Sequence, residues 1–235
     1  MRRPFSFQQL WDSAVAGFVY LPQTLAIAAA AYLICLVVGF AVAVARIWGP
    51  RVLGSVLQVV LSIVKAVPVY LIFLLSALVA TLYGPSLFAA LHIHADASAI
   101  DMRVVAVLAL ALAFTPAASE GFRGGLLAVP AGQVEAAQSV GLTGTQTMWR
   151  IIVPQMLPEA IPVLTNCLLS LTKAASLAIL IGAMDVLNAA VNAASDSYDY
   201  LEAYIAAAVM YWAICVVLEF SMFRLAHRAG RFKAR

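Results

Sequence analysis

Residues 24–45 read TLAIAAAAYLICLVVGFAVAVA, a stretch that contains no charged side chain. As a helix it would rise about 33 Å, enough to cross the roughly 30 Å hydrocarbon core of a bilayer. The charge-free run begins at Ser13, so we expect the residues before Pro22 to lie along the membrane surface. Because apolar sequence continues far beyond the length of a signal peptide's apolar region, the segment predicts a retained membrane span.

The composition of the whole chain supports a membrane protein. Of its 235 residues, 64% are apolar and 11% are charged, against roughly 45–50% and 25% in soluble domains. A soluble domain of this length cannot bury that apolar excess, so it must face lipid. The net charge of +3 is too small to indicate a nucleic-acid partner. Cys35, Cys167 and Cys215 lie in apolar runs without CxxC spacing, which argues against disulfides or a thiolate metal site.

Four more apolar runs are long enough to cross the membrane, and few charges interrupt them. The chain is too short to hold a second soluble domain of usual size as well. We therefore predict an all-α integral membrane fold with five transmembrane helices in one domain, residues 1–235. The expected spans are about 24–45, 53–82, 103–122, 160–184 and 203–224.

The distribution of Lys and Arg predicts the orientation, because these residues favour cytoplasmic loops. The C-terminal tail carries five of them, whereas residues 185–202 carry four acidic residues and no basic one. With five spans, a cytoplasmic C-terminus places the N-terminus outside. Arg2, Arg3 and Arg103 oppose this arrangement, and nine basic residues support it.

Between the third and fourth spans lies a long segment, about 123–158, whereas helix connections usually take roughly 2–8 residues. We expect the Gly-Gly pair at 124–125 and Pro130 to break the preceding helix. A short helix should then run from Gly132 to Val140 and end at Gly141. A connection of this length and content suggests a functional element outside the membrane.

This segment resembles the EAA loop of the membrane subunits of bacterial ABC importers, usually written EAA-x3-G-x9-I-x-LP. The chain has Glu135-Ala136-Ala137, Gly141, Ile151 and Val153-Pro154 at the same spacing, with valine in place of leucine. Residues Gly17 to Leu25 also resemble the entry to the first span in importers of this kind, so the likeness covers nearly the whole chain. Further matches, typical of the polar amino-acid and opine branch, are Glu120, Arg123-Gly124-Gly125, Val129-Pro130, Gly132-Gln133, Lys173 and Ser176-Leu177.

The resemblance implies a type I ABC importer permease with a cytoplasmic coupling helix in the bacterial plasma (inner) membrane. It implies alternating access for a polar amino acid or derivative, with this chain forming half of the pathway. The implied partners are two ATP-binding cassette ATPase subunits, a second permease subunit as homo- or heterodimer, and a periplasmic or lipid-anchored solute-binding protein. The chain would be no enzyme and hold no cofactor, since the ATPase would bind ATP and Mg. The residues implied to couple to the ATPase are Gln133, Glu135, Ala136, Ala137, Gly141, Ile151 and Pro154.

Two lysines lie within apolar spans, where a charge usually faces a cavity, a partner or a pathway. Lys65 and Lys173 could attract a substrate carboxylate, or each could cap helix carbonyls or snorkel to a span end. Glu120 could pair with one of them or with Arg123, and we favour a structural ion pair. The candidate pathway residues are Lys65, Pro68, Glu120, Lys173 and Ser176.

The chain departs from the branch where substrate contacts would be expected. It reads Lys65-Ala66-Val67-Pro68 where relatives often have Arg-Gly-Thr-Pro, and Lys173-Ala174-Ala175-Ser176-Leu177 where hydroxyl or carboxyl groups are common. The substrate would then carry fewer polar groups, or this chain would be the non-binding half of a heterodimer.

Two other classes of function stay open. A channel or ion-coupled secondary transporter would explain the buried lysines, but it would leave the long connection without a role. An intramembrane Ser/Lys hydrolase could use Ser62-x-x-Lys65 or Ser170-x-x-Lys173, yet its S-D-N and K-T-G companion motifs are missing. His92, His94 and Asp96 make an incomplete metal set, so we expect a solvated loop there and no metal site.

Overall fold

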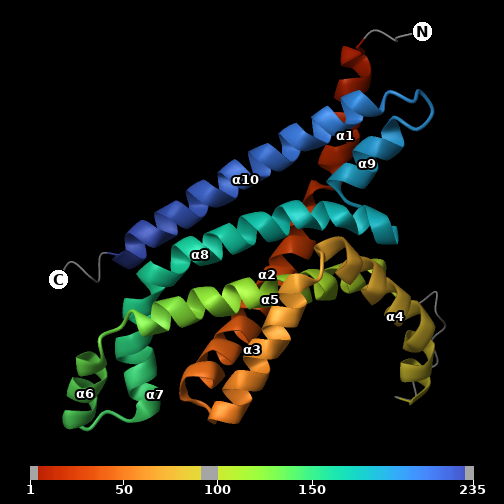
Figure 1. The fold of residues 1–235 in the computed structure, drawn as a ribbon. Helices are drawn as coiled ribbons and strands as arrows, with labels where there is room; N and C mark the ends of the chain where they lie inside the picture. Colours follow the sequence, from red (N-terminus) through yellow and green to blue (C-terminus); the bar gives the residue numbers. More distant parts are fainter. Residues whose placement is uncertain (1–4, 91–99, 231–235) are drawn as a thin grey trace. The chain divides into compact units, whose positions relative to one another are not determined.

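The computed structural model describes residues 5–90 and 100–230, and every regular element in these ranges is a helix (Figure 1). The histidines at 92 and 94 and Asp96 lie outside the described residues. The elements are α1 (Phe7–Val19), α2 (Leu21–Trp48), α3 (Arg51–Ala66), α4 (Val69–Ala90), α5 (Met102–Leu127), α6 (Ala131–Ser139), α7 (Gly144–Thr147), the π-helix η2 (Met148–Ile152), α8 (Val153–Ala174), the 3-10 helix η3 (Ala175–Ile181), α9 (Val186–Ala193) and α10 (Tyr200–Gly230).

Five segments of the described chain are long and apolar enough to cross a membrane. They are Leu21–Trp48, Val69–Ser86, Met102–Leu127, Gly144–Ile181 and Tyr200–His227. The predicted all-α fold with five membrane helices is therefore confirmed.

The second predicted span, 53–82, is wrong as a single helix. The helix α3 ends at Ala66 and α4 begins at Val69, with Pro68 between them. Proline lacks a backbone N–H and disfavours helical geometry in the residue before it, here Val67. The Pro68 carbonyl accepts from Leu71 N at 2.9 Å, so Pro68 directly precedes α4 and accepts a hydrogen bond from its first turn.

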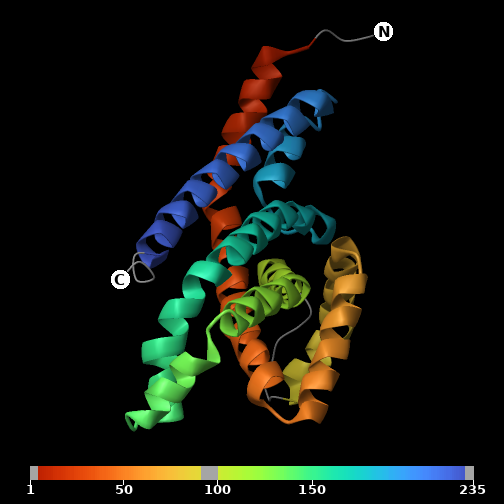
Figure 2. The same ribbon diagram turned by 60° about the vertical axis from the view of Figure 1, so that its left-hand side comes forward.

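The chain divides into two compact units. The first unit comprises Met1–Leu33, Ala66–Ala113 and Ser170–Val216. In it α1 packs against α9, and η3 contacts both α4 and α9 (Figures 1 and 2). Gln9 of α1 donates its side-chain amide to the Ala193 carbonyl at 2.9 Å, which satisfies a carbonyl at the C-terminal end of α9.

Asp185 organises the polar interior of the first unit. It is fully buried and caps α9 by accepting from Asn188 N at 2.8 Å, and its second oxygen accepts from the Tyr211 hydroxyl at 2.7 Å. Burial raises the pKa of the Asp185 carboxyl, and these hydrogen bonds act in the opposite direction. Thr24 accepts from Val186 N at 3.1 Å, so α2, α9 and α10 meet around this carboxyl.

The second unit comprises Ile34–Lys65, Phe114–Leu169 and Val217–Arg235. Here the predicted helix break at Gly124-Gly125 is wrong, because α5 continues to Leu127. Gly125 is a packing position: a Cβ there would lie 2.9 Å from the Met156 carbonyl oxygen and 3.0 Å from the Ala160 Cβ. The long connection predicted at 123–158 is therefore helical at both ends, and residues 128–130, which end with Pro130, separate α5 from α6.

The two adjacent glycines provide a matched pair of variants. Gly125→Ala should lower the stability by about 1–3 kcal/mol, since the new Cβ collides with backbone of α8. Gly124→Ala meets nothing within 4 Å and should be neutral or stabilise by up to about 1 kcal/mol, because alanine favours helix. The measurement is the thermal unfolding midpoint of each purified protein in nanodiscs. Equal midpoints would contradict the close contact between α5 and α8.

Candidate functional site

The helix α6 carries the first half of the EAA set. Glu135 and Ala136 are exposed, whereas Ala137 is only 5% exposed. The side chain of Ala137 therefore packs within its own chain. The exposed part of α6 that carries Glu135 and Ala136 is what this helix offers to another molecule.

Gly141 ends this short helix as predicted. The helix proper is Ala131–Ser139, one residue earlier at each end than expected, and Gly141 follows with φ +80°. Its backbone N–H donates to the Gln138 carbonyl at 2.9 Å, and Leu142 N donates to the Ala137 carbonyl at 3.1 Å. This left-handed conformation is one that glycine adopts at little cost, so residue 141 sets the direction in which the chain leaves α6.

The second half of the EAA set lies where the chain enters its next long helix. In α7, Thr143 and Gln146 form a reciprocal capping box. The π-helical turn η2 then holds Ile151, and Pro154 is the second residue of α8. The helix α6 contacts both α7 and η2, and the Gln155 side chain donates to the Gln133 side-chain oxygen at 3.4 Å. The residues of the motif thus join α6 to the start of α8 (Figure 1).

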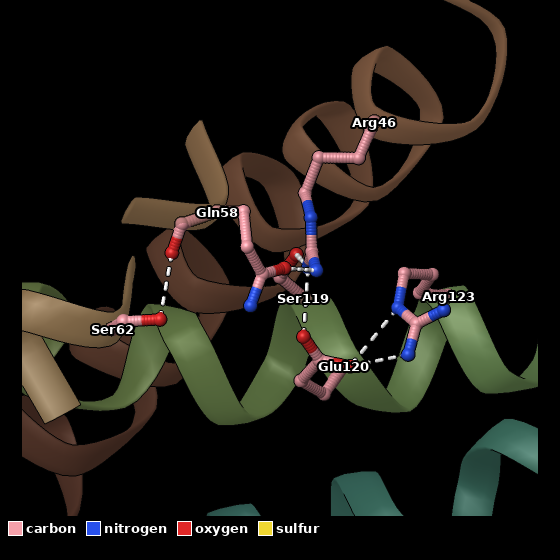
Figure 3. Close-up of polar contacts among 6 residues, drawn as sticks. All are labelled: Arg46, Gln58, Ser62, Ser119, Glu120 and Arg123. Atoms are coloured by element: carbon pink, nitrogen blue, oxygen red, sulfur yellow. Dashed lines mark hydrogen bonds and ion pairs between the residues drawn. The ribbon is translucent and has the colours of Figure 1, made fainter. Parts of the chain in front are cut away.

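An ion cluster occupies the second unit at the level where α2 meets α5 (Figure 3). Glu120 lies between two guanidinium groups: Arg46 Nη1 is 2.8 Å from Oε1, and Arg123 Nε is 3.0 Å from Oε2. The Arg46 side chain is only 7% exposed and also contacts Ser119 and the side-chain oxygen of Gln58. The favoured structural ion pair of Glu120 is confirmed, and of the partners considered it is Arg123, not Lys65 or Lys173, that pairs with it among the described residues.

Sequence reasoning missed Arg46 as the main partner of Glu120. The position of Arg46 near the end of a span was used only to predict the orientation of the chain in the membrane. A signal was available. A carboxylate in an apolar span needs a counter-charge, and Arg46 is the basic residue that directly follows the first apolar run.

Both candidate lysines lie on exposed polar stripes. On α3, polar residues recur at intervals of four and three, which places them on one face of the helix: Arg51, Ser55, Gln58, Ser62 and Lys65. On α8 the corresponding exposed polar residues are Glu159, Asn166, Ser170 and Lys173. Neither lysine forms an ion pair within residues 5–90 and 100–230.

The remaining candidates lie close to these lysines in sequence. Pro68 is exposed at the start of α4, and Ser176 of η3 donates to the Lys173 carbonyl at 2.8 Å. Ser62 donates its hydroxyl to the Gln58 carbonyl at 2.8 Å, so that proton is directed to its own helix and not to Lys65. This geometry gives no support to a Ser62/Lys65 catalytic pair.

Residues 36–231 match the family described as "Binding-protein-dependent transport system inner membrane component". The chain is 34% identical over 229 residues to the L-cystine transport system permease protein TcyL of Bacillus subtilis (strain 168), covering 97% of this chain and 92% of that protein. It is 28% identical over 228 residues to the glutamate transport system permease protein GluD of Corynebacterium glutamicum, covering 97% and 78%.

Two solved structures have a similar fold. The crystal structure of an amino acid ABC transporter with histidines gives a TM-score of 0.76 at 22% identity, covering 96% of this chain and 100% of that one. An inward-facing structure of the MetNI methionine ABC transporter gives a TM-score of 0.68 at 18% identity, covering 96% and 99%. The helical arrangement is therefore shared with membrane subunits of known transporters.

The ion cluster yields a stability prediction. Glu120→Gln should cost about 2–4 kcal/mol, because it leaves the buried Arg46 guanidinium without a counter-charge. Arg123→Gln should cost less than about 1 kcal/mol, since this guanidinium is 38% exposed and Glu120 keeps Arg46 as partner. Unfolding of both variants in nanodiscs, compared with the unmodified chain, checks the order. A larger loss for Arg123→Gln would contradict Arg46 as the main partner.

Proposed function

Because the chain belongs to the family of binding-protein-dependent transport system inner membrane components, we propose that it forms half of the translocation pathway of an ATP-driven importer for an amino acid. The observation that carries the proposal is the EAA set, built onto a short helix with exposed Glu135 and Ala136 and joined through η2 to α8. Relatives named for cystine and glutamate transport support the substrate class.

The exposed part of α6 that carries Glu135 and Ala136 is the proposed contact for the ATPase. Two such ATPases would bind ATP and Mg, so this chain needs no cofactor of its own. The complete assembly further contains a second permease subunit and a periplasmic or lipid-anchored solute-binding protein. The polar stripe of α8 supports the second subunit, because polar side chains on a membrane helix need a neighbour other than lipid.

In this proposal the N-terminus lies outside and the C-terminus lies in the cytoplasm. The basic residues support it: Arg46, Arg51, Arg123 and Arg150 belong to the same unit as α6, and further basic residues follow Arg224 along α10 and the tail. An ATPase in the cytoplasm could contact α6 only with this orientation.

The substrate pathway would be lined by the two polar stripes. The amino acids named for the relatives differ in their side chains and share an α-carboxylate, a group that Lys65 and Lys173 can attract. Pro68 and Ser176 would shape the pathway beside them, while Glu120 would hold α2 to α5. Apolar residues at Val67, Ala174 and Ala175 would leave few contacts for the rest of the substrate.

Alternating access then follows from a continuous helical path. ATP closes the ATPase dimer and moves α6, which contacts η2. The segment Gly144–Ile181 runs from α7 through η2 and α8 past Lys173, so a displacement of α6 is passed along it. The pathway opens outward to accept substrate from the binding protein, and hydrolysis resets it inward. Such a cycle needs an inward-open and an outward-open state of similar free energy, and ATP binding shifts the equilibrium between them.

The ATPase contact has a matched test on α6. Ala136→Arg should reduce recovery of the ATPase with the purified permease by about tenfold or more, because a buried unpaired charge weakens an interface strongly. Ala131→Arg adds the same charge at an exposed position about 140° around the helix and should retain most of the ATPase. Full recovery with Ala136→Arg, in folded protein, would contradict both the contact and the orientation.

The pathway has a separate test at Lys173. In proteoliposomes holding the complete transporter, Lys173→Ala should lower amino-acid uptake per assembled complex by about tenfold or more, because the carboxylate loses its counter-charge. Lys173→Arg keeps the charge and should retain part of the uptake. Radiolabelled cystine and glutamate serve as substrates. An alanine variant with unchanged uptake would contradict a pathway role for Lys173.

A further inference from the structure

The π-helical turn η2 contains one residue more than the buried face of its helix requires. Along α8, buried residues recur at intervals of four: Ile152, Met156, Ala160, Leu164 and Leu168. Just before Ile152 the interval is five, because the preceding buried residue is Thr147. The hydrogen bond from Val153 N to the Met148 carbonyl spans the same number of residues. An α-helical turn bonds four residues back, so η2 holds one extra residue.

The side chains around η2 also fit an α-helical register, in which each N–H bonds four residues back. With α8 held in place, that register puts Met148, four residues before Ile152, where Thr147 now lies. Met148 is apolar and half-buried here, so it suits a buried position. The change of register turns α7 by about 100° around the helix axis relative to α8.

Thr147 makes the present π register costly. Its side chain is 3% exposed, and its buried hydroxyl oxygen has no hydrogen-bond partner among the described residues. A buried hydroxyl without a partner is unfavourable, and the α register would release it. The present register must therefore be held by contacts outside the turn, and α6 supplies them, since it contacts both α7 and η2.

Pro154 removes a hydrogen bond that would otherwise fix the register. In the π register the N–H of residue 154 would bond to the Trp149 carbonyl, and in the α register to the Arg150 carbonyl. Proline has no backbone N–H, so this bond is missing in both registers. The turn can therefore change register without breaking a hydrogen bond at that position.

The moving side chains have room beside the turn. A hollow of about 500 Å³ in the second unit is bordered by Met148 and Trp149 on one side and by Phe40 and Val44 of α2 on the other. The Trp149 side chain is 61% exposed. A rotation at η2 therefore need not displace α2.

We infer that η2 is a two-register joint that converts a displacement of α6 into a rotation between α7 and α8. Thr147 is shielded in the π register and Met148 in the α register, and movement of α6 selects between them. This inference rests on the proposed function, because the ATPase supplies the movement of α6. It adds the element that changes state when the ATPase closes.

The first test measures the register directly. It uses the complete transporter in nanodiscs, with the native cysteines replaced and a single new one at Thr147→Cys or Met148→Cys. Each variant is modified with a maleimide reagent in the nucleotide-free state and after trapping with ATP and vanadate. Modification of the two positions should change in opposite directions, each by about tenfold, because one side chain replaces the other in the buried position.

The second test removes the extra residue. Deletion of Arg150 puts Thr147 four residues before Ile152, so the turn keeps its faces but has a single register. The protein should unfold at its usual midpoint and retain the ATPase, while uptake falls by about tenfold or more. Arg150→Gln keeps the length and should retain most of the uptake. Deletion of Val163, in the regular part of α8, turns the rest of that helix by about 100° and should destabilise the protein.

Three results would overturn the inference. They are labelling that stays constant or changes in the same direction at both positions, native uptake after deletion of Arg150, and a loss of stability after that deletion as large as after deletion of Val163. A failure of the proposed function is distinguishable, because it would appear as missing ATPase or missing uptake in the unmodified chain.

Discussion

The hydrocarbon of a bilayer offers no hydrogen-bond partners, and this constraint explains most of the arrangement described here. Backbone groups are satisfied by continuous helices. Hydroxyl groups bond back to carbonyls one turn earlier in their own helix, as Thr81, Thr165 and Ser221 do at 2.7 to 2.9 Å. Glu120 is held between two guanidinium groups. Polar side chains that remain exposed on α3 and α8 therefore mark faces whose neighbour is water or protein.

The same constraint decides what could be predicted from the sequence. Five membrane helices followed from the length of the apolar runs, because a span must match the bilayer thickness. The end of α6 followed from Gly141, whose positive φ is a local property. In contrast, the break at Pro68 was missed, since hydropathy stays high across it, and Gly124-Gly125 was read as a break. Gly125 serves a contact with α8, and no local pattern reveals a partner distant in sequence.

In the candidate site, too, local features could be predicted from the sequence and contacts between distant residues could not. The spacing of the EAA set located the short helix, yet it could not tell that Ala137 packs inward while Ala136 stays exposed. Arg46 was missed as the partner of Glu120 because the pair is separated by 74 residues. A hollow of about 500 Å³ in the second unit had no sequence signal, since its wall is assembled from α2, α6, α7 and η2.

The continuity of α8 from Val153 to Ala174 has a consequence for how sequences of this kind can diverge. In a helix, each inserted or deleted residue turns everything beyond it by about 100°. One extra residue between Pro154 and Asn166 would turn Asn166, Ser170 and Lys173 together by about 100°, while α6 and η2 stayed as they are. A length change there would therefore redirect the whole polar stripe of α8 at once, whereas a substitution changes one side chain within a fixed register.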